Sequence, residues 1–242
     1  MAVSIDRVYQ KVLAFANKEQ RGYITPQEFN LFANQAQMEI FEQYFYDINQ
    51  WNRQHGNSTG HSDILTNLEE KVSLFERYDQ LAEVQGSHGN VMTSFFDRIY
   101  RLEMVRVDYE TNPRFVVAEE IQLNELQQYG NAPLGVWSKK RPVYTRYTGS
   151  INVGAMRIYP YPSSDPDVDR VFLSYIQTPA VPSWGYVVVN DKALYNSTTS
   201  QDFELHLSEE SELVYRILAY AGIAIEKPQL TQMAAGFEQA KV

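Results

Sequence analysis

The chain has 242 residues, with 21 Lys and Arg against 30 Asp and Glu, a formal net charge of −9 and no cysteine. Without cysteine it can form no disulfide, no thiolate zinc site and no cysteine nucleophile. The acidic balance disfavours a general nucleic-acid binder, no apolar run approaches the ~20 residues that span a bilayer, and we expect no secretory signal because the start of the chain lacks a basic segment followed by an apolar one.

The aromatic content is high, at 13% of the chain, and 17 residues are Tyr. Tyr combines a large apolar face with a polar tip, which suits a protein whose surfaces become interfaces. A Tyr-rich sheet and core explains the same count, so composition leaves both interpretations open.

The first part of the chain has a helical pattern. Apolar residues at spacings of three and four predict a helix over residues 4–17. The next helix has a capping box, with Thr25 as N-cap, Pro26 at the first helical position and Glu28 three residues after the cap. We expect this helix to reach Trp51.

A third helix is expected over Asn67–Leu81, because Glu and Lys favour helix there, although a strand over Val72–Phe75 is the alternative. After a Gly- and Ser-containing boundary before residue 91, short apolar runs separated by turn residues predict strands. The expected strands are Ile99–Tyr109, Phe115–Ala118, Val143–Tyr147, Met156–Tyr159, Val171–Ile176 and Tyr186–Val189, with a short helix over Glu120–Tyr129.

The last part of the chain is again helical, beginning at Ser208 as an N-cap followed by acidic residues in the first turn and interrupted at Pro228. The sequence therefore divides into a helical segment over residues 1–90, a β-rich segment over 91–207 and C-terminal helices over 208–242.

One loop resembles a calcium site in its spacing. In residues 17–29, Gly22, Ile24 and Glu28 fall at positions six, eight and twelve of an EF-hand loop. Position five, however, is Arg21, a cation where a carboxylate should bind Ca²⁺. We interpret the segment as a helix end followed by the capping box, and we expect no metal.

No pattern indicates a catalytic residue or a cofactor. The four histidines form no i, i+4 pair, and the chain has no nucleophile elbow and no phosphate-binding loop. Asp165, Asp167 and Asp169 alternate in a Pro- and Ser-rich stretch, which we interpret as a turn whose carboxylates bind the backbone rather than a metal. The sequence leaves a glycosidase-type carboxylate pair open.

A short basic run is interleaved with aromatic residues. Lys139, Lys140 and Arg141 are followed by Tyr144 and Tyr147. A contact with nucleic acid is one interpretation. An edge strand protected by charge, or a salt-bridged contact with an acidic neighbouring subunit, is favoured, and these five residues are the predicted inter-subunit contact.

Three stretches together carry a family resemblance. Arg141–Pro162 (R-P-V-Y-T-R-Y-T-G-S-I-N-V-G-A-M-R-I-Y-P-Y-P) ends in a Tyr-Pro turn, Asp167–Pro179 (D-V-D-R-V-F-L-S-Y-I-Q-T-P) follows, and Asp202–Gly222 opens an acid-capped helix. This pattern resembles the head-to-tail connector proteins of tailed bacteriophages, the adaptor ring under the portal. The segment N-K-E-Q-R-G-Y-I-T-P-Q-E-F-N near the N-terminus is similar to structural proteins of crAss-like and other podovirus-like phages.

The resemblance implies an α+β fold in which a helical bundle is built from the N- and C-terminal segments, with a β-rich insertion in the middle. It implies a non-enzymatic virion protein of the neck or tail, assembled in the bacterial host cytoplasm. Its expected partners are copies of itself in a ring, a dodecamer in such families, the portal protein, and further neck or tail ring proteins. Genomic DNA would pass through the lumen without specific binding, and no membrane is involved.

The resemblance also suggests how the ring meets the portal. The final helix Gln229–Val242 maps to the family's docking segment, so Leu230, Met233, Phe237 and Val242 are predicted to contact the portal or another partner. Packing of this helix on its own subunit is the alternative. Other functions left open are a gatekeeper or baseplate component, a carbohydrate-binding or hydrolytic β domain, and a calcium-regulated module.

Overall fold

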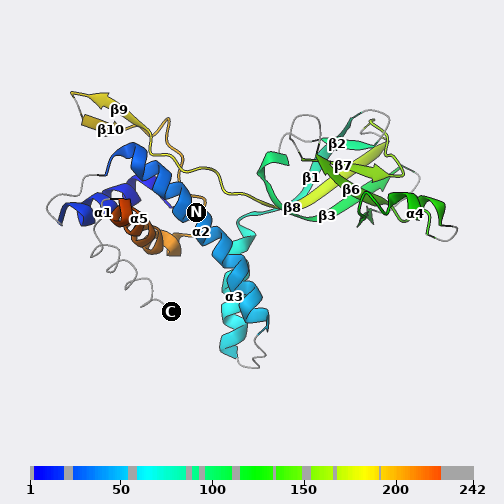
Figure 1. Cartoon of the computed structure of the whole chain (residues 1–242), viewed down its shortest axis with the longest axis horizontal. Helices are drawn as coiled ribbons and strands as arrows, with labels where there is room; N and C mark the ends of the chain where they lie inside the picture. The colour runs from blue at the N-terminus through cyan, green and yellow to red at the C-terminus, as the bar shows by residue number, and fades with distance from the viewer. Residues whose placement is uncertain are drawn as a thin grey trace. The chain divides into compact units, whose positions relative to one another are not determined.

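The computed structural model describes residues 3–18, 24–53, 59–85, 89–92, 96–110, 115–132, 135–148, 154–165, 168–190 and 192–224. The chain forms two compact units (Figure 1). Unit 1 combines Met1–Leu74 with Pro179–Val242, and unit 2 is Phe75–Thr178. The segment boundaries predicted from sequence, after residues 90 and 207, both lie later. The strand Glu76–Gln85 therefore falls in the predicted helical segment, and the strands Tyr186–Val189 and Lys192–Tyr195 of unit 1 fall in the predicted β-rich segment.

The predicted helical bundle with a β-rich insertion is wrong. The β part is a large eight-stranded mixed sheet that forms a unit with its own core. The helices of unit 1 pack around an extended segment that begins at Pro179 as well as on one another. The fold is α+β, but long-range strand pairing and this extended segment organise it.

The sheet of unit 2 has the strand order β4-β3-β8-β1-β2-β7-β6-β5. Neighbouring strands are antiparallel except for the parallel pair β5 and β6. The strands are β1 (Glu76–Gln85), β2 (Asn90–Met92), β3 (Ile99–Tyr109), β4 (Val116–Val117), β5 (Glu119–Glu120), β6 (Val143–Thr148), β7 (Gly154–Tyr159) and β8 (Asp169–Gln177). The prediction of β3 is confirmed residue for residue, and those of β6, β7 and β8 to within two residues at each end.

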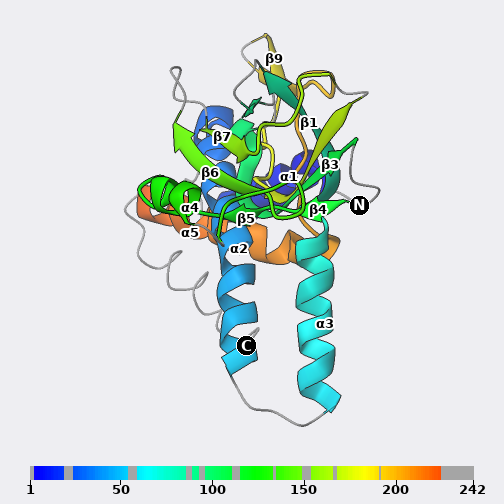
Figure 2. The ribbon, with the colours of Figure 1, turned by 90° about the vertical axis from the view of Figure 1, so that its right-hand side faces the viewer.

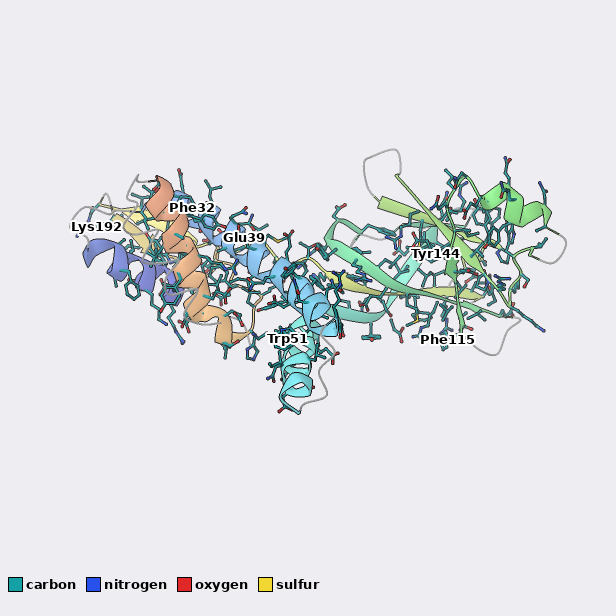
Figure 3. The ribbon with its side chains drawn as sticks, turned by 60° about the horizontal axis from the view of Figure 1, so that its bottom comes forward. Phe32, Glu39, Trp51, Phe115, Tyr144 and Lys192 are labelled. Atoms are coloured by element: carbon teal, nitrogen blue, oxygen red, sulfur yellow. The ribbon has the colours of Figure 1, made fainter. Side chains whose placement is uncertain are left out.

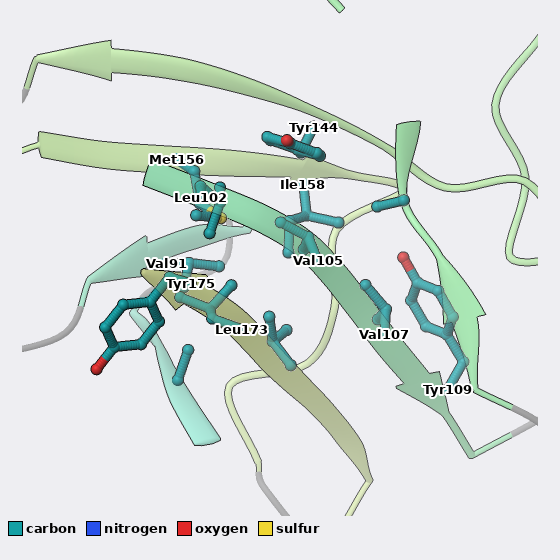
Figure 4. Close-up of a cluster of buried hydrophobic side chains, with 13 residues drawn as sticks. Val91, Leu102, Val105, Val107, Tyr109, Tyr144, Met156, Ile158, Leu173 and Tyr175 are labelled. Carbon is teal, nitrogen blue, oxygen red and sulfur yellow. The ribbon is translucent and has the colours of Figure 1, made fainter. Parts of the chain in front are cut away.

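The core of this unit lies on one face of the sheet (Figure 4). Along β3, alternate residues Val105, Val107 and Tyr109 are fully buried, as the two-residue period of a strand requires. The Tyr109 hydroxyl donates to the Pro160 carbonyl oxygen over 2.7 Å. Burial, followed by the nearby charge of Asp169, raises the Tyr109 pKa.

The predicted third helix is partly wrong. The helix α3 (Thr59–Ser73) ends before the predicted range does, and β1 begins at Glu76. There Glu76 pairs with Ile176 and Leu81 with Phe172 in β8. Helix propensity is a weak prior, and pairing with a strand about one hundred residues away overrides it.

The structure also tests the predicted short helix and the Asp-rich stretch of unit 2. The short helix expected over Glu120–Tyr129 is α4 (Leu126–Asn131), because Glu119 and Glu120 pair with β6 instead. In the Asp-rich stretch the prediction is confirmed for Asp169, whose carboxylate accepts from the N–H groups of Glu110 (3.1 Å) and Ser163 (2.7 Å). Asp167 lies outside the described residues. A 3-10 turn, η1 (Phe96–Arg98), precedes β3.

Unit 1 contains the helices α1 (Ile5–Lys18), α2 (Pro26–Arg53), α3 and α5 (Glu210–Ala224), which is preceded by the 3-10 turn η2 (Leu207–Glu209). The capping box of α2 is confirmed. Thr25 Oγ1 accepts from the Glu28 N–H over 3.3 Å, and Glu28 Oε2 accepts from the Thr25 N–H over 2.9 Å. The bond from the Thr25 N–H, followed by the one that the Thr25 hydroxyl donates to the same carboxylate over 2.7 Å, lowers the Glu28 pKa. Both ribbon views show α3 alongside the C-terminal part of α2 (Figure 2).

Residues 179–206, which we call the return segment, lead from unit 2 back into unit 1 and are held to α2 by a buried amide. Gln37 is fully buried. Its Nε2 donates to the Ala180 carbonyl oxygen over 2.7 Å, and its Oε1 accepts from the Glu204 N–H over 3.2 Å. The Glu204 carboxylate in turn accepts from the Ala180 N–H over 2.8 Å. One helical side chain therefore joins both ends of the return segment.

Trp184 is the apolar centre of the same segment. Its backbone N–H donates to Asn30 Oδ1 over 2.7 Å and its indole N–H donates to Asp6 Oδ1 over 3.0 Å. Its ring centroid lies 4.3 Å from that of Tyr9. Asp202 completes the arrangement by accepting from the Ile5 N–H, which starts α1, over 2.9 Å.

Ion pairs link the helices around this core. Glu210 at the start of α5 pairs with Lys11 (2.8 Å) and Arg7 (3.3 Å) of α1, and Arg216 of α5 pairs with Glu39 of α2 over 3.3 Å. Figure 3 labels Glu39 and Phe32 on α2. The Phe32 ring stacks with Tyr220 of α5 at 6.3 Å between centroids.

We expect Gln37→Leu to lower the free energy of unfolding by about 2–4 kcal/mol. The substitution leaves the Ala180 carbonyl and the Glu204 N–H without their bonds from Gln37, and an unsatisfied buried polar group costs about 1–3 kcal/mol. Urea unfolding measures the loss. Gln35→Leu, at an exposed position of the same helix, is the control. Equal losses in the two variants would contradict the role of Gln37 in holding the return segment.

We expect Glu210→Gln to lower the free energy of unfolding by about 1 kcal/mol at pH 7. In acid the two proteins should have the same free energy of unfolding. The bond from Lys11 and the charges of Lys11 and Arg7 lower the Glu210 pKa from 4.5, against the opposing effect of burial. Because the folded pKa is depressed, the stabilisation is present above pH 4.5 and disappears as the pH falls through the folded value.

Urea unfolding of both proteins from pH 7 to pH 3 measures the difference. The two curves should converge below pH 4.5, whereas a gap that stays constant would contradict the assigned ion pairs. Glu42→Gln, at an exposed position of α2, controls for the change in net charge.

Candidate interaction surfaces

The β5–β6 edge of unit 2 collects the predicted basic contact residues. Arg141 pairs with Glu119 over 3.1 Å and Arg146 pairs with Glu120 over 2.8 Å. Both residues of the short outer strand β5 therefore carry a carboxylate that faces an arginine. Charged side chains on a short edge strand hinder the addition of another strand, so this edge has the form of the protected edge considered from sequence.

The turn before β6 exposes the two lysines. The Ser138 N–H donates to the Arg141 carbonyl oxygen (3.2 Å) and the Arg141 N–H donates to that of Ser138 (2.9 Å). Lys139 and Lys140 lie between them and are exposed. The Lys139 ammonium lies 5.4 Å from the centroid of the Tyr109 ring. The structure thus gathers Lys139, Lys140 and Arg141 in one turn, and their contact with another subunit stays a prediction.

The two tyrosines of this set lie on β6. Tyr144 is buried in the core of unit 2 (Figure 4), and its hydroxyl donates to Glu120 Oε2 over 3.0 Å. Burial is the main cause that raises the Tyr144 pKa. Tyr147 pairs with Ala155 of β7. The ring of Tyr144 is therefore part of the core of unit 2.

The other predicted contact residues, Leu230, Met233, Phe237 and Val242, lie outside the described residues, so their role stays a prediction. Gly22 and Arg21 of the calcium-like loop also lie outside them. His206 lies inside, and its Nδ1 accepts from the Ser208 N–H over 3.3 Å. His206 is therefore the N-cap of η2, two residues before Ser208, which was the predicted N-cap.

The hairpin of β9 (Tyr186–Val189) and β10 (Lys192–Tyr195) is the surface that the sequence analysis missed. The prediction of β9 is confirmed, but neither β10 nor the exposure of both strands was expected. Val187, Val188 and Leu194 are 50%, 62% and 53% exposed. The stretch Y-V-V-V-N-D-K-A-L-Y contains the signal, because a two-residue Asn-Asp turn between apolar runs is typical of a hairpin.

A cavity of about 350 Å³ in unit 2 is lined by Leu81–Val84 of β1 and by Ser163, Ser164, Asp169 and Arg170. Its buried carboxylate, Asp169, already accepts the two backbone N–H groups described above. Each of its two oxygens accepts one of these N–H groups, so this side chain holds the turn in place.

Among the described residues, no three His, Asp or Glu side chains are placed to hold a metal ion. Every helix in the same part of the chain is too short or too polar to cross a membrane. The chain matches no protein-family model, and a search of curated proteins finds no match.

We expect Tyr144→Phe to lower the free energy of unfolding by about 1 kcal/mol, because it removes one hydrogen bond to a carboxylate and keeps the buried ring. The mass of any assembly should not change. Urea unfolding and analytical ultracentrifugation measure the two effects, with Tyr78→Phe on the exposed part of β1 as the control. A loss of assembly at unchanged stability would place Tyr144 in a subunit contact instead.

Proposed function

We propose that the chain is a structural subunit of a phage head-to-tail connector ring, which docks under the portal and continues the DNA channel towards the tail. The observation that supports assembly is the β9–β10 hairpin. Its three valines and its leucine are 46–62% exposed. Apolar patches on monomers are small, and larger ones mark interaction sites. The virion setting rests on the resemblance in the sequence.

The charge distribution is compatible with this function. Unit 1 holds 17 acidic and 10 basic residues, a net charge of −7, while unit 2 holds 13 and 11, a net charge of −2. A protein next to moving DNA should not bind phosphates strongly, and each Lys or Arg contact with a phosphate adds affinity. An excess of carboxylates keeps such contacts few.

The function is tested by measuring particle mass with and without the portal protein of the same virus. We expect the chain to form a closed multimer that co-sediments with the portal. A chain that stays monomeric beside the portal would contradict the proposal. A multimer that ignores the portal but binds a tail or baseplate protein would favour the gatekeeper or baseplate alternative.

The portal contact is tested by a chain that ends at Lys227. We expect it to unfold cooperatively, as the full chain does, and to lose co-sedimentation with the portal. Retained co-sedimentation, or failure to fold, would contradict a docking role for residues 228–242.

A further inference from the structure

The β9–β10 hairpin is regular and tightly turned. Val189 pairs with Lys192, Val188 with Ala193, and Tyr186 with Tyr195. The turn begins at Asn190, whose φ of 51° lies in the left-handed region that two-residue hairpin turns require and that Asn tolerates. Figure 3 shows Lys192, the first residue of β10, on this hairpin.

The base of the hairpin is fixed to the rest of unit 1 by aromatic contacts. The ring centroids of Tyr186 and Tyr195 each lie 5.8 Å from that of Trp184, which is buried and bonded to Asp6 and Asn30. The hairpin is therefore held by one end, and its exposed valines lie beyond an anchored aromatic cluster.

In each strand of the hairpin, alternate residues direct their backbone N–H and C=O groups away from the other strand. The Asn196 N–H donates to the Gly185 carbonyl oxygen over 2.8 Å, one pair below Tyr186 and Tyr195. Because bonded and non-bonded pairs alternate in an antiparallel ladder, the N–H and C=O groups of Val188 point away from β10, and those of Ala193 point away from β9.

Both outer edges of the hairpin are open within the part of the chain that the structure describes, since its sheet contains only these two strands. Natural proteins protect such edges with charges, as this chain does with Glu119 and Glu120 at β5. The hairpin edges carry Val188 and Ala193 instead. In a chain that protects its β5 edge with charge, hairpin edges left open at Val188 and Ala193 indicate that another strand pairs there.

Charge selects a second copy of the chain as the partner. Residues 186–195 contain one Asp and one Lys, so the hairpin is neutral, while unit 1 as a whole carries −7. Copies of an acidic chain repel one another across most of their surface, but two hairpins approach without that repulsion. The two edges also differ, as a head-to-tail interface in a ring requires.

We propose that the outer edge of β9 in one copy pairs with the outer edge of β10 in the next, so that the hairpins form a continuous antiparallel sheet around the ring. Closure of such a sheet leaves no open edge. This inference rests on the proposed ring function and assigns its subunit contact to backbone hydrogen bonds at Val188 and Ala193.

The test uses Val188→Pro and Ala193→Pro in the full chain. Proline removes the outward N–H and blocks that edge, but an edge strand accommodates it where its nitrogen faces solvent. Each variant alone should lose every species larger than the 28.0 kDa monomer in analytical ultracentrifugation. Val188→Thr, which keeps the N–H, should assemble as the wild type does.

Mixing the two proline variants gives the sharper result. The Val188→Pro chain keeps its β10 edge and the Ala193→Pro chain keeps its β9 edge, so one interface can form between them and no more. An equimolar mixture should yield a heterodimer of twice the monomer mass. Thermal unfolding of each variant checks that unit 1 stays folded.

Three outcomes would overturn the inference: proline variants that assemble like the wild type, a mixture that yields no heterodimer, or a wild type that stays monomeric. The first two leave the connector function standing if the wild type still co-sediments with the portal. Loss of that co-sedimentation in the wild type would overturn the function itself.

Discussion

Gln37 lies in the middle of a 28-residue helix and makes the contact on which unit 1 depends. Its amide bonds Ala180 on one side and Glu204 on the other, so it holds the chain where it returns from unit 2 and again before α5. A buried amide is costly unless both of its ends are bonded. The bonds of Gln37 therefore fix the position of the return segment. Trp184 and the hairpin both belong to that segment.

The hairpin is exposed as a consequence of this arrangement. Trp184 packs against Tyr9 and bonds Asn30 and Asp6, which anchors Tyr186 and Tyr195 but leaves Val187, Val188 and Leu194 uncovered. In unit 2 the same chain protects its short β5 strand with Glu119 and Glu120, each paired with an arginine. The contrast between these two edges is the observation from which the proposed subunit contact is argued.

Sequence reasoning succeeded where the signal is local. The Thr25 and Glu28 capping box lies within one turn, and the alternation of Val105, Val107 and Tyr109 lies within one strand. It failed at the end of the predicted helix Asn67–Leu81, where the residues from Glu76 onward pair with β8 instead. It also found the basic turn at Lys139 without the carboxylates of β5 that face it, because parallel pairing of β5 with β6 cannot be inferred from either segment alone.

By itself, the sequence determined the absence of thiol chemistry, the acidic charge, the start of α2 and the position of β3, because each depends on composition or on a period of a few residues. Only the tertiary structure decided that residues 76–85 form a strand, that Gln37 clamps the return segment, and that the β9–β10 hairpin is left with open edges. The first outcome depends on pairing with a strand about one hundred residues away, and the second on hydrogen bonds that span 143 and 167 residues. Such contacts are selected by the free energy of the whole fold, which a local pattern does not contain.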